Sequence, residues 1–332
     1  MELIQLAHGS GGRMMHQLIN DYFVPAFDLK NLSDSAVIET ALSGRIAITT
    51  DSYVVSPLFF PGGDIGRLSV CGTVNDLAVS GAIPMYMTAG FIIEEGFPFY
   101  DLGRVLDSMK AAAEEAGIKI VAGDTKVVDR GKADGLFINT AGFGVVEDGL
   151  DLSPMKVRPG DRVILSGSIG NHGVAVMAER NGISFDPPLL SDVAPLNRLV
   201  RRMAGMTKEI HMMRDPTRGG VATTLKEIAS QSGHCIMVQE SSIKVRPGVR
   251  GACELLGLDP LYIANEGILI AIVDPGVADR LAEEMRQTTE GAETVVIGEV
   301  AEAPREAVLL KTNAGGIRII DMLSGDQLPR IC

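Results

Sequence analysis

The chain has 332 residues, a length beyond which single hydrophobic cores usually stop growing, so two domains are predicted. Apolar residues make up 46% and charged residues 22%, which indicates a globular protein, and no apolar stretch is long enough to span a membrane. The net charge of −12, without a compensating basic run, argues against nucleic acid as a partner.

The start of the chain is polar and glycine-rich up to Arg13. It lacks the basic region and following apolar run that a secretory or organellar targeting segment needs. We therefore expect a cytoplasmic protein.

In the first half of the chain, apolar strand-like runs alternate with amphipathic helical patterns, which predicts a layered α/β domain. A helix over 64–80 would be capped by Asp64 and would stop at Gly81. A second helix is predicted over 100–116, and strands are predicted over 45–55, 85–93, 118–122 and 136–146.

Residues 153–160 are polar and include Pro154 and Pro159, which suits a junction between domains. We predict a first domain over 1–152, a second α/β domain over 153–322, and a mobile tail over 323–332 with little to pack. Strands of the second domain are expected over 162–166, 235–239, 267–273, 294–298, 307–311 and 317–320. Its helices are expected over 174–180, 195–203, 221–231 and 277–288.

The four cysteines show no CxxC spacing, so a zinc site, an iron-sulfur site and a disulfide framework are all poorly supported. Cys71, Cys235 and Cys253 lie in apolar patterns and are expected to be small buried hydrophobes. Cys332 is different, because it ends a tail without apolar periodicity, where burial does not explain it.

Aspartates placed at the ends of apolar strands or beside small residues form the most informative pattern: Asp51, Asp76, Asp124 and Asp215. Mg²⁺ takes oxygen ligands and bridges to nucleotide phosphates, so carboxylates at strand ends favour a triphosphate site. Each aspartate alone is more often a turn former or helix cap. The combination, with Lys126 beside Asp124, favours a metal-nucleotide site, and Asp34 is a weaker fifth candidate.

Two glycine-rich segments, 8–13 and 166–173, could approach phosphate oxygens through their backbone N–H groups. Neither has the GxxxxGK[ST] pattern of a P-loop, and the five histidines share no ligand spacing. Glu266 lies immediately before the apolar run 268–273 and is a candidate base if burial raises its pKa. The alternative, which the sequence by itself favours, is a solvated loop residue.

Six motifs, taken together, closely resemble the HypE family of carbamoyl dehydratases, which act in [NiFe]-hydrogenase maturation. They are Thr50-Asp51, Val-Asn-Asp-Leu-Ala-Val-Ser-Gly-Ala82, Gly-Asp-Thr-Lys126, Asp-Pro-Thr-Arg-Gly-Gly220, Asn265-Glu-Gly267 and the ending Pro-Arg-Ile-Cys332. The resemblance covers the whole chain, and the ending is its most specific element. The aspartate motifs are also similar to those of the wider PurM-like superfamily, which includes aminoimidazole ribonucleotide synthetase, selenophosphate synthetase and thiamine monophosphate kinase.

The resemblance implies a two-domain PurM-like α/β fold, in which N-terminal domain strands close into a barrel across a homodimer and ATP sites lie beside that interface. It implies Mg²⁺ and ATP as cofactors, held by Asp51, Asn75, Asp76, Asp124, Thr125, Lys126 and Asp215, with Asp51, Asp76 and Asp124 on the metal. Lys126 and Glu266 would serve the dehydration.

The resemblance also implies the substrate and the partners. The carbamoyltransferase HypF would load a carbamoyl group on Cys332, and ATP-dependent dehydration would turn this S-carboxamide into a thiocyanate. The cyanide would then pass to iron on the HypC–HypD complex. Two alternatives stay open: a kinase or synthetase of the same superfamily that acts on a diffusible small molecule, and a non-catalytic adapter that docks through its Ile-Cys tail.

Overall fold

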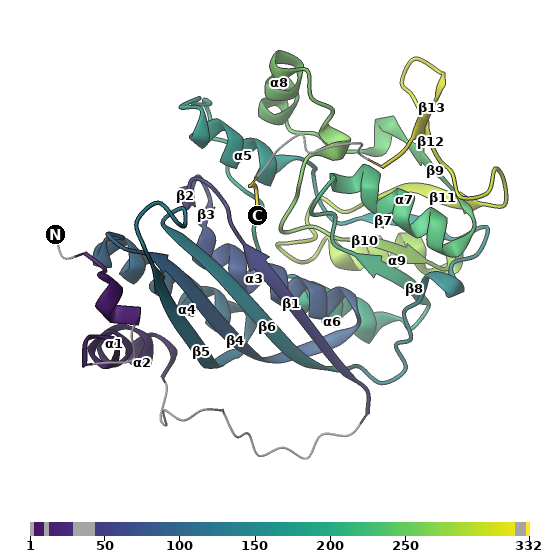
Figure 1. Ribbon diagram of the computed structural model, residues 1–332. Helices are drawn as coiled ribbons and strands as arrows, with labels where there is room; N and C mark the ends of the chain where they lie inside the picture. Colours follow the sequence, from purple (N-terminus) through teal and green to yellow (C-terminus); the bar gives the residue numbers. More distant parts are fainter. Residues whose placement is uncertain (1–2, 10–12, 29–43, 323–329) are drawn as a thin grey trace.

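The structure is a computed structural model that describes residues 3–9, 13–28, 44–322 and 330–332. Asp34, the middle of the glycine-rich segment 8–13 and residues 323–329 of the predicted tail lie outside the described residues. The described chain forms two α/β halves, and the C-terminus lies between them beside α3 and α5 (Figure 1). The first described residues, 3–9, lie at the far edge of the first half.

The first half contains a four-stranded sheet with the order β1-β6-β4-β5. Its strands are β1 (Ile46–Tyr53), β4 (Ala82–Glu94), β5 (Lys119–Val128) and β6 (Leu136–Val146). Strands β4 and β5 are parallel, and the other two pairs are antiparallel. A short hairpin of β2 (Phe59–Phe60) and β3 (Gly63–Asp64) precedes α3.

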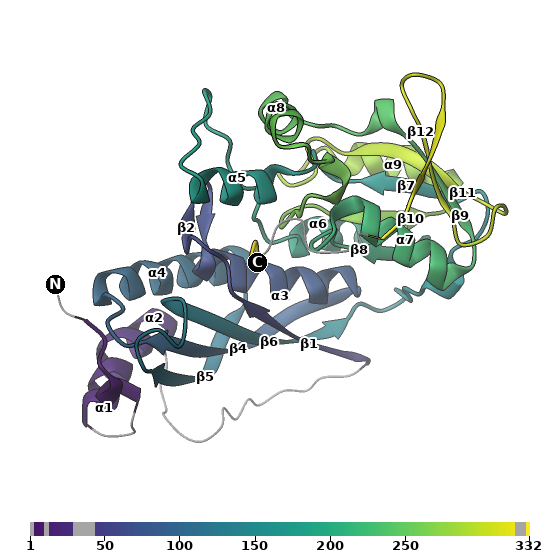
Figure 2. The ribbon, with the colours of Figure 1, turned by 45° about the horizontal axis from the view of Figure 1, so that its top comes forward.

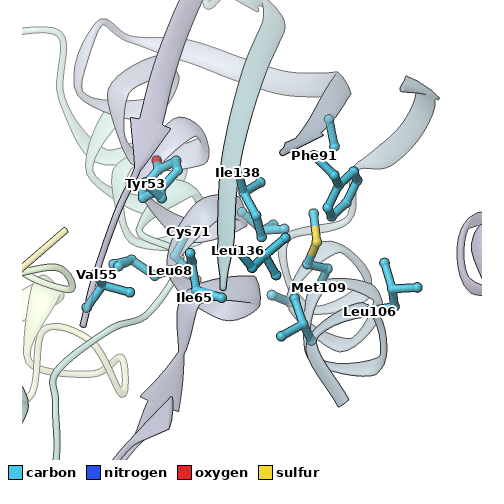
Figure 3. Close-up of a cluster of buried hydrophobic side chains, with 14 of the residues drawn as sticks. Tyr53, Val55, Ile65, Leu68, Cys71, Phe91, Leu106, Met109, Leu136 and Ile138 are labelled. Carbon is cyan, nitrogen blue, oxygen red and sulfur yellow. The ribbon is translucent and has the colours of Figure 1, made fainter. Parts of the chain in front are cut away.

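Helices α3 (Ile65–Val79) and α4 (Phe99–Ala116) cover one face of this sheet (Figure 2). Their side chains and those of the inner sheet face form a core that includes Leu68, Met109 and Ile138 (Figure 3). Short helical segments pack at the N-terminal end: η1 (Leu6–Gly9), α1 (Arg13–Leu18), η2 (Ile19–Phe23) and α2 (Val24–Phe27).

Helix α3 connects the two halves. It begins where the Asp64 carboxylate accepts hydrogen bonds from the backbone N–H groups of Gly66 and Arg67, as an N-cap should. Nearly all of its residues are buried, because the first sheet lies on one side and the second half lies on the other. Among its fifteen residues only Arg67 and Asp76 keep appreciable exposure.

The second half contains a seven-stranded sheet with the order β13-β12-β9-β11-β7-β10-β8. Helix α7 packs on one face, and α6 and α9 pack on the other, which explains why β10 is apolar throughout and β7 is apolar after Arg162. Its strands are β7 (Arg162–Leu165), β8 (Ile210–Arg214), β9 (Cys235–Gln239), β10 (Ile270–Val273), β11 (Val295–Ala301), β12 (Val308–Lys311) and β13 (Ile317–Ile320). Its helices are α5 (Asn171–Arg180), α6 (Asn197–Met206), α7 (Gly220–Ser232), α8 (Pro247–Leu256) and α9 (Pro275–Met285), with short turns η3 (Pro154–Lys156), η4 (Glu240–Ser242) and η5 (Pro260–Tyr262).

The predicted helices and strands are all present, and the two sheets lie on either side of the junction predicted at 153–160. The sequence missed β8, α8 and the short N-terminal helices. The strand expected over 267–273 begins only at Ile270, because the preceding residues form a loop that contributes to the site described below. Cys71, Cys235 and Cys253 are buried, as predicted.

The outer face of the four-stranded sheet is uncovered by other described residues (Figure 2), and it carries exposed apolar side chains from β1 and β4. Ile46 and Ile48 of β1 are 55% and 76% exposed, and Ile83 and Ile92 of β4 are 39% and 44% exposed. Large contiguous apolar surfaces of this kind mark interaction sites. Among the helices that the structure describes, none is long and apolar enough to cross a membrane.

Candidate active site between the two domains

A cavity of about 250 Å³ opens where β1, the middle of α3 and two loops of the second half meet. One loop follows β8 and the other precedes β10. The cavity is lined by Thr50, Asp51, Gly72, Asp76, Asp215, Thr217, Arg218, Glu266 and Cys332. Three of the four predicted aspartates, the predicted base and the terminal cysteine therefore share one site.

The last three residues of the chain are held along the segment that follows β1. The backbone N–H of Val54 donates to the carbonyl oxygen of Cys332 at 3.3 Å, and that of Ser56 donates to the carbonyl of Arg330 at 3.1 Å. The Ile331 side chain is 4% exposed and packs against the core of the first half. These contacts leave Cys332 half-buried, whereas the sequence predicted little packing for this part of the chain.

A guanidinium faces the terminal thiol. The Nε of Arg218 donates to the Sγ of Cys332 at 3.4 Å, and its Nη2 lies 4.0 Å from the Asp51 carboxylate. Burial and the negative charge of Glu266 raise the pKa of the Cys332 thiol to about 11, against the lowering effect of Arg218. The docked thiol is therefore protonated at neutral pH.

Glu266 is 3% exposed, so the solvated loop residue that the sequence favoured was wrong. Two hydrogen bonds hold its backbone in place. The Asn75 side-chain amide donates to the Glu266 backbone carbonyl at 3.1 Å, and the Asp192 carboxylate accepts from the Glu266 backbone N–H at 3.2 Å. At the next position, a Cβ on Gly267 would lie 1.8 Å from the Asp192 carbonyl oxygen, so only glycine fits. The loop can therefore turn the Glu266 side chain into the cavity.

The side-chain carboxylate of Glu266 is not fully hydrogen-bonded. Its Oε1 is buried and has no hydrogen-bond partner within the part of the chain that the structure describes. Burial, followed by the negative charges of Asp215 and Asp192, raises its pKa well above that of an ordinary glutamate. A group with these properties is a candidate proton acceptor in a protected site.

Asp76 and Asp215 show the same signs of crowded negative charge. Burial raises the pKa of Asp76, which accepts a hydrogen bond from the Thr49 hydroxyl at 2.8 Å. Burial and the nearby Asp76 raise the pKa of Asp215 to about 7. Partly buried carboxylates that repel one another are suited to a hard divalent cation, so this pair of oxygen ligands fits Mg²⁺.

A second groove of about 640 Å³ runs along β1 and β8 and shares Asp76, Asp215 and Thr217 with the first cavity. Apolar side chains from Ile46, Ile48, Leu152, Met212 and Met213 line its other parts. An apolar groove that ends at a cluster of carboxylates matches a ligand with a flat apolar base at one end and a metal-bound anion at the other.

The remaining predicted residues lie elsewhere in the chain. Asn75 is 1% exposed, and its amide is bonded to backbone groups of the second half, so it positions the Glu266 loop. Asp124 and Lys126 are ion-paired at 3.4 Å on the outer sheet face, with side chains 67% and 62% exposed. Thr125 lies between them, and its side chain is buried on the opposite face.

The strand order explains this separation. Asp51 is on β1 and Asp124 is on β5, at opposite edges of the sheet and three strand spacings apart, or about 14 Å. Asp51 also points to the helical face, whereas Asp124 points to the outer face. Among the described residues there is no group of three or more His, Cys, Asp or Glu residues that could hold a metal. One protomer therefore does not gather the three predicted metal ligands.

Asp51 lies inside β1 and Asp76 inside α3, in the strand and the helix predicted over 45–55 and 64–80, and Asp215 directly follows β8. Asp124, expected after a strand over 118–122, lies inside β5, because that strand continues to Val128. Sequence reasoning also missed two residues with roles in the site. Arg218 lies within a motif that was recognised, but its position beside the thiol depends on the docked tail. Asp192 had no sequence signal.

Comparisons with known proteins give a consistent result. Models of the AIR synthase related protein N-terminal and C-terminal domains match residues 32–146 and 158–311. The carbamoyl dehydratase HypE of Rhizobium leguminosarum bv. viciae is 54% identical over 99% of this chain and 95% of its own length. A crystal structure of hydrogenase maturation protein HypE in complex with ATP is 47% identical, covers 99% of both chains and has a TM-score of 0.95. A chain of a HypE–HypF complex is 47% identical over 92% of this chain and 99% of its own, with a TM-score of 0.82.

Proposed function

Since this chain belongs to the HypE family of carbamoyl dehydratases, we propose that it uses ATP to dehydrate an S-carboxamide on its own Cys332 and leaves a thiocyanate on that sulfur. The two-domain PurM-like α/β fold that the motifs predict is confirmed by the family models and the HypE structures. The thiocyanate would provide the cyanide ligand of the [NiFe]-hydrogenase iron centre. The four free cysteines agree with a reducing compartment, and we place the reaction in the cytoplasm.

The observation that carries this proposal is the position of the terminal thiol in the same cavity as Glu266 and Asp76. A carbamoyl group on the Cys332 sulfur would lie between the arginine and the carboxylates. The substrate is then part of the chain, so its effective concentration at the site does not depend on diffusion.

The chemistry requires two steps because an amide oxygen is a poor leaving group. In the first, the carboxamide oxygen attacks the γ-phosphorus of ATP, ADP departs, and one N–H proton is lost, which leaves an O-phosphorylated carbon doubly bonded to nitrogen. In the second, the remaining N–H proton is removed and the C–O bond breaks. Inorganic phosphate then leaves with the oxygen, and a C≡N group remains on sulfur.

Glu266 is the group that we propose to accept a proton from nitrogen. Its raised pKa makes the ionised carboxylate a stronger base than an exposed glutamate. Its burial keeps water away from the intermediate, which would otherwise hydrolyse. Arg218, beside the sulfur, is suited to the developing negative charge on the carboxamide oxygen.

We propose that the ATP triphosphate lies against Asp51, Asp76 and Asp215 and that the adenosine extends into the groove along β1 and β8. Mg²⁺ bound to these carboxylates and to phosphate oxygens would neutralise charge on the transferred phosphoryl group. Asn75 and Thr125, which the resemblance also assigns to the nucleotide, would act by holding the surrounding backbone, since both side chains are buried.

A homodimer would complete the site. The uncovered outer face of the four-stranded sheet carries Ile46, Ile48, Ile83 and Ile92, and packing two such faces together in a closed barrel would bury them. If the β1 edge of one protomer meets the β5 edge of its partner, the exposed Asp124 and Lys126 approach the cavity of the neighbouring chain. We therefore propose that each active site uses the two residues from the second copy, and that Lys126 serves the dehydration there.

The partners follow from the same proposal. A related chain is found in a HypE–HypF complex, and we propose that HypF loads the carbamoyl group on Cys332. The HypC–HypD complex is the proposed cyanide acceptor. A small-molecule kinase is the less supported alternative, because it gives no role to a terminal thiol seated beside Glu266 and Arg218.

The test is Cys332→Ser, examined with HypF, a labelled carbamoyl donor and ATP. The variant should bind ATP as the parent does but take up no label, because a hydroxyl is a much poorer nucleophile than a thiolate near neutral pH. Cys253→Ala, which changes a buried cysteine outside the cavity, should be loaded normally. Label retained by Cys332→Ser would place the acceptor elsewhere and favour the kinase alternative.

A further inference from the structure

His172, the second residue of α5, is fully buried beside the C-terminus and has no part in the chemistry above. Its Nε2 lies 2.9 Å from the carbonyl oxygen of Ile331, and its Nδ1 lies 2.8 Å from the hydroxyl of Ser191. The ring of Phe60 meets it edge-on, with centroids 5.4 Å apart. The imidazole is thus fixed on three sides, and one of these is the residue that precedes the reactive cysteine.

The direction of these hydrogen bonds follows from the groups involved. A carbonyl oxygen only accepts, so Nε2 carries the proton and donates to Ile331. Burial lowers the pKa of His172 to about 4, so the ring is neutral near pH 7 and Nδ1 accepts the hydroxyl proton of Ser191. The Ser191 oxygen in turn accepts the backbone N–H of Val193 at 3.1 Å. All these groups are satisfied only while the tail is docked, because departure of Ile331 leaves the Nε2–H without that acceptor.

The hydrogen bonds to the backbone of the tail are independent of what the cysteine carries. His172 bonds a backbone carbonyl, and so do the N–H groups of Val54 and Ser56 and the Nη2 of Arg180, which donates to the Arg330 carbonyl at 2.7 Å. The Sγ of Cys332 takes no part in any of them. A free, carbamoylated or cyanated thiol can therefore be held by the same set of hydrogen bonds.

We propose that His172 is a positioning residue that latches the C-terminal tail in the cavity and thereby sets how Cys332 is divided between its own active site and the loading enzyme. The latch rests on the geometry of the docked tail, and its consequence for turnover rests on the proposed function. The loading enzyme needs the thiol outside the cavity, and dehydration needs it inside. A weaker latch therefore favours the first reaction over the second.

Two substitutions distinguish the effect of the His172 N–H donor from the effect of its aromatic ring. His172→Gln keeps an N–H near the Nε2 position, whereas His172→Phe keeps the ring volume and the contact with Phe60 but removes the donor. The first readout is alkylation of Cys332 by iodoacetamide in the full chain, located by peptide mass spectrometry. Cys71, Cys235 and Cys253 are buried, so alkylation of the folded chain reports the release of the tail.

Loss of one buried hydrogen bond should raise the alkylation rate of His172→Phe about three- to ten-fold, and His172→Gln should lie near the parent. In the same His172→Phe variant, carbamoyl loading by HypF should be unchanged or faster while single-turnover dehydration slows, by a smaller factor than the alkylation gain because a tail that is mostly docked loses only part of its docked population. General destabilisation would slow both reactions, so the opposite directions identify a latch.

Alkylation at the parental rate in folded His172→Phe would overturn the proposal, even if dehydration also failed. If His172→Phe does not fold, Ser191→Ala decides the matter, because it removes the hydroxyl that orients the ring and should raise the alkylation rate about two- to three-fold. No increase would again contradict the latch. The alkylation readout uses neither ATP nor HypF, so it separates failure of the latch from failure of the proposed dehydratase function.

Discussion

The Nε of Arg218 lies 3.4 Å from the Sγ of Cys332. A positive charge therefore faces the atom that would bear the carbamoyl carbon, in the same cavity as the carboxylates that would hold the metal. The side chain is 72% exposed and reaches Asp51 with its other nitrogen, so its position is set by the docked tail and not by packing.

Replacing Arg218 with Gln should leave carbamoyl loading intact and slow dehydration about ten- to a hundred-fold, the value of a charge-assisted hydrogen bond in the transition state. Single-turnover mass spectrometry of the carbamoylated chain measures this rate. Arg218→Lys should recover part of the dehydration rate, because Lys keeps the positive charge but lacks the planar set of N–H donors that Arg has. Equal rates in the parent and Arg218→Gln would remove this residue from the mechanism.

Glu266→Gln should bind ATP and accept carbamoyl on Cys332, yet accumulate the carbamoylated form, because Gln keeps the shape of Glu but accepts a proton poorly. The parent given ATP should become lighter by one water as the thiocyanate forms, and intact-mass measurement separates the two species. If the variant dehydrates as fast as the parent, Lys126 becomes the next candidate for the base.

Removal of a carboxylate from the nucleotide site should weaken Mg-ATP binding while the fold survives. Asp51→Ala, Asp76→Ala and Asp124→Ala should each lower the affinity about ten-fold or more, since each loses a charged group near the metal and phosphates. Calorimetric titration gives the affinities, and the exposed Asp148→Ala serves as a control for net charge. Unchanged affinity in all three variants would contradict the nucleotide site.

The shared active site can be tested by co-expressing two variants, each of which has one defective residue. Asp51→Ala and Lys126→Ala should each be inactive alone, whereas co-expression should restore about one quarter of the parental activity, because half of the dimers are mixed and each has one intact site. Co-expression of Asp51→Ala with Asp76→Ala should restore nothing, because both residues belong to the same cavity. Failure of the first pair would show that Lys126 does not act across the dimer.

Asp192 should make the stability of the chain depend on pH. Burial, opposed by backbone N–H donors, raises its pKa from 3.8 to about 6. Between these values the folded chain holds a proton that the unfolded chain has released, so the contribution of Asp192 to the free energy of unfolding falls as the pH rises through this window. Asp192→Asn should therefore be more stable than the parent at pH 8, by about 2 kcal/mol, and similar to it at pH 4.

Thermal unfolding at both pH values measures the effect, with Asp148→Asn as the control for net charge at an exposed position. A stability difference that is the same at pH 4 and pH 8 would show that the carboxyl of Asp192 is not the cause.

Local features of the fold were predictable because their causes are local. The Asp64 cap and the apolar spacing define α3 within a residue or two of its bounds, and the run over 136–146 was predicted as the strand that is observed. The strand β8 was missed because its five residues, Ile-His-Met-Met-Arg, contain a single β-branched residue and no regular alternation of apolar and polar positions.

The sequence by itself determined which residues have the chemistry: an oxygen-ligand set, a terminal thiol and the family motifs that connect them. Only the tertiary structure decided which of them meet. Glu266 is buried because Asn75, 191 residues away in sequence, holds its backbone, and no pattern around Glu266 contains that contact. Asp124 and Lys126 are separated from Asp51 because strand order sets the distance between residues on different strands, and side-chain alternation sets the face on which each lies. Burial and mutual distance are properties of the packed chain, so the pKa values follow from the fold and not from the motifs. Our proposal that a second protomer completes the site rests on the same properties.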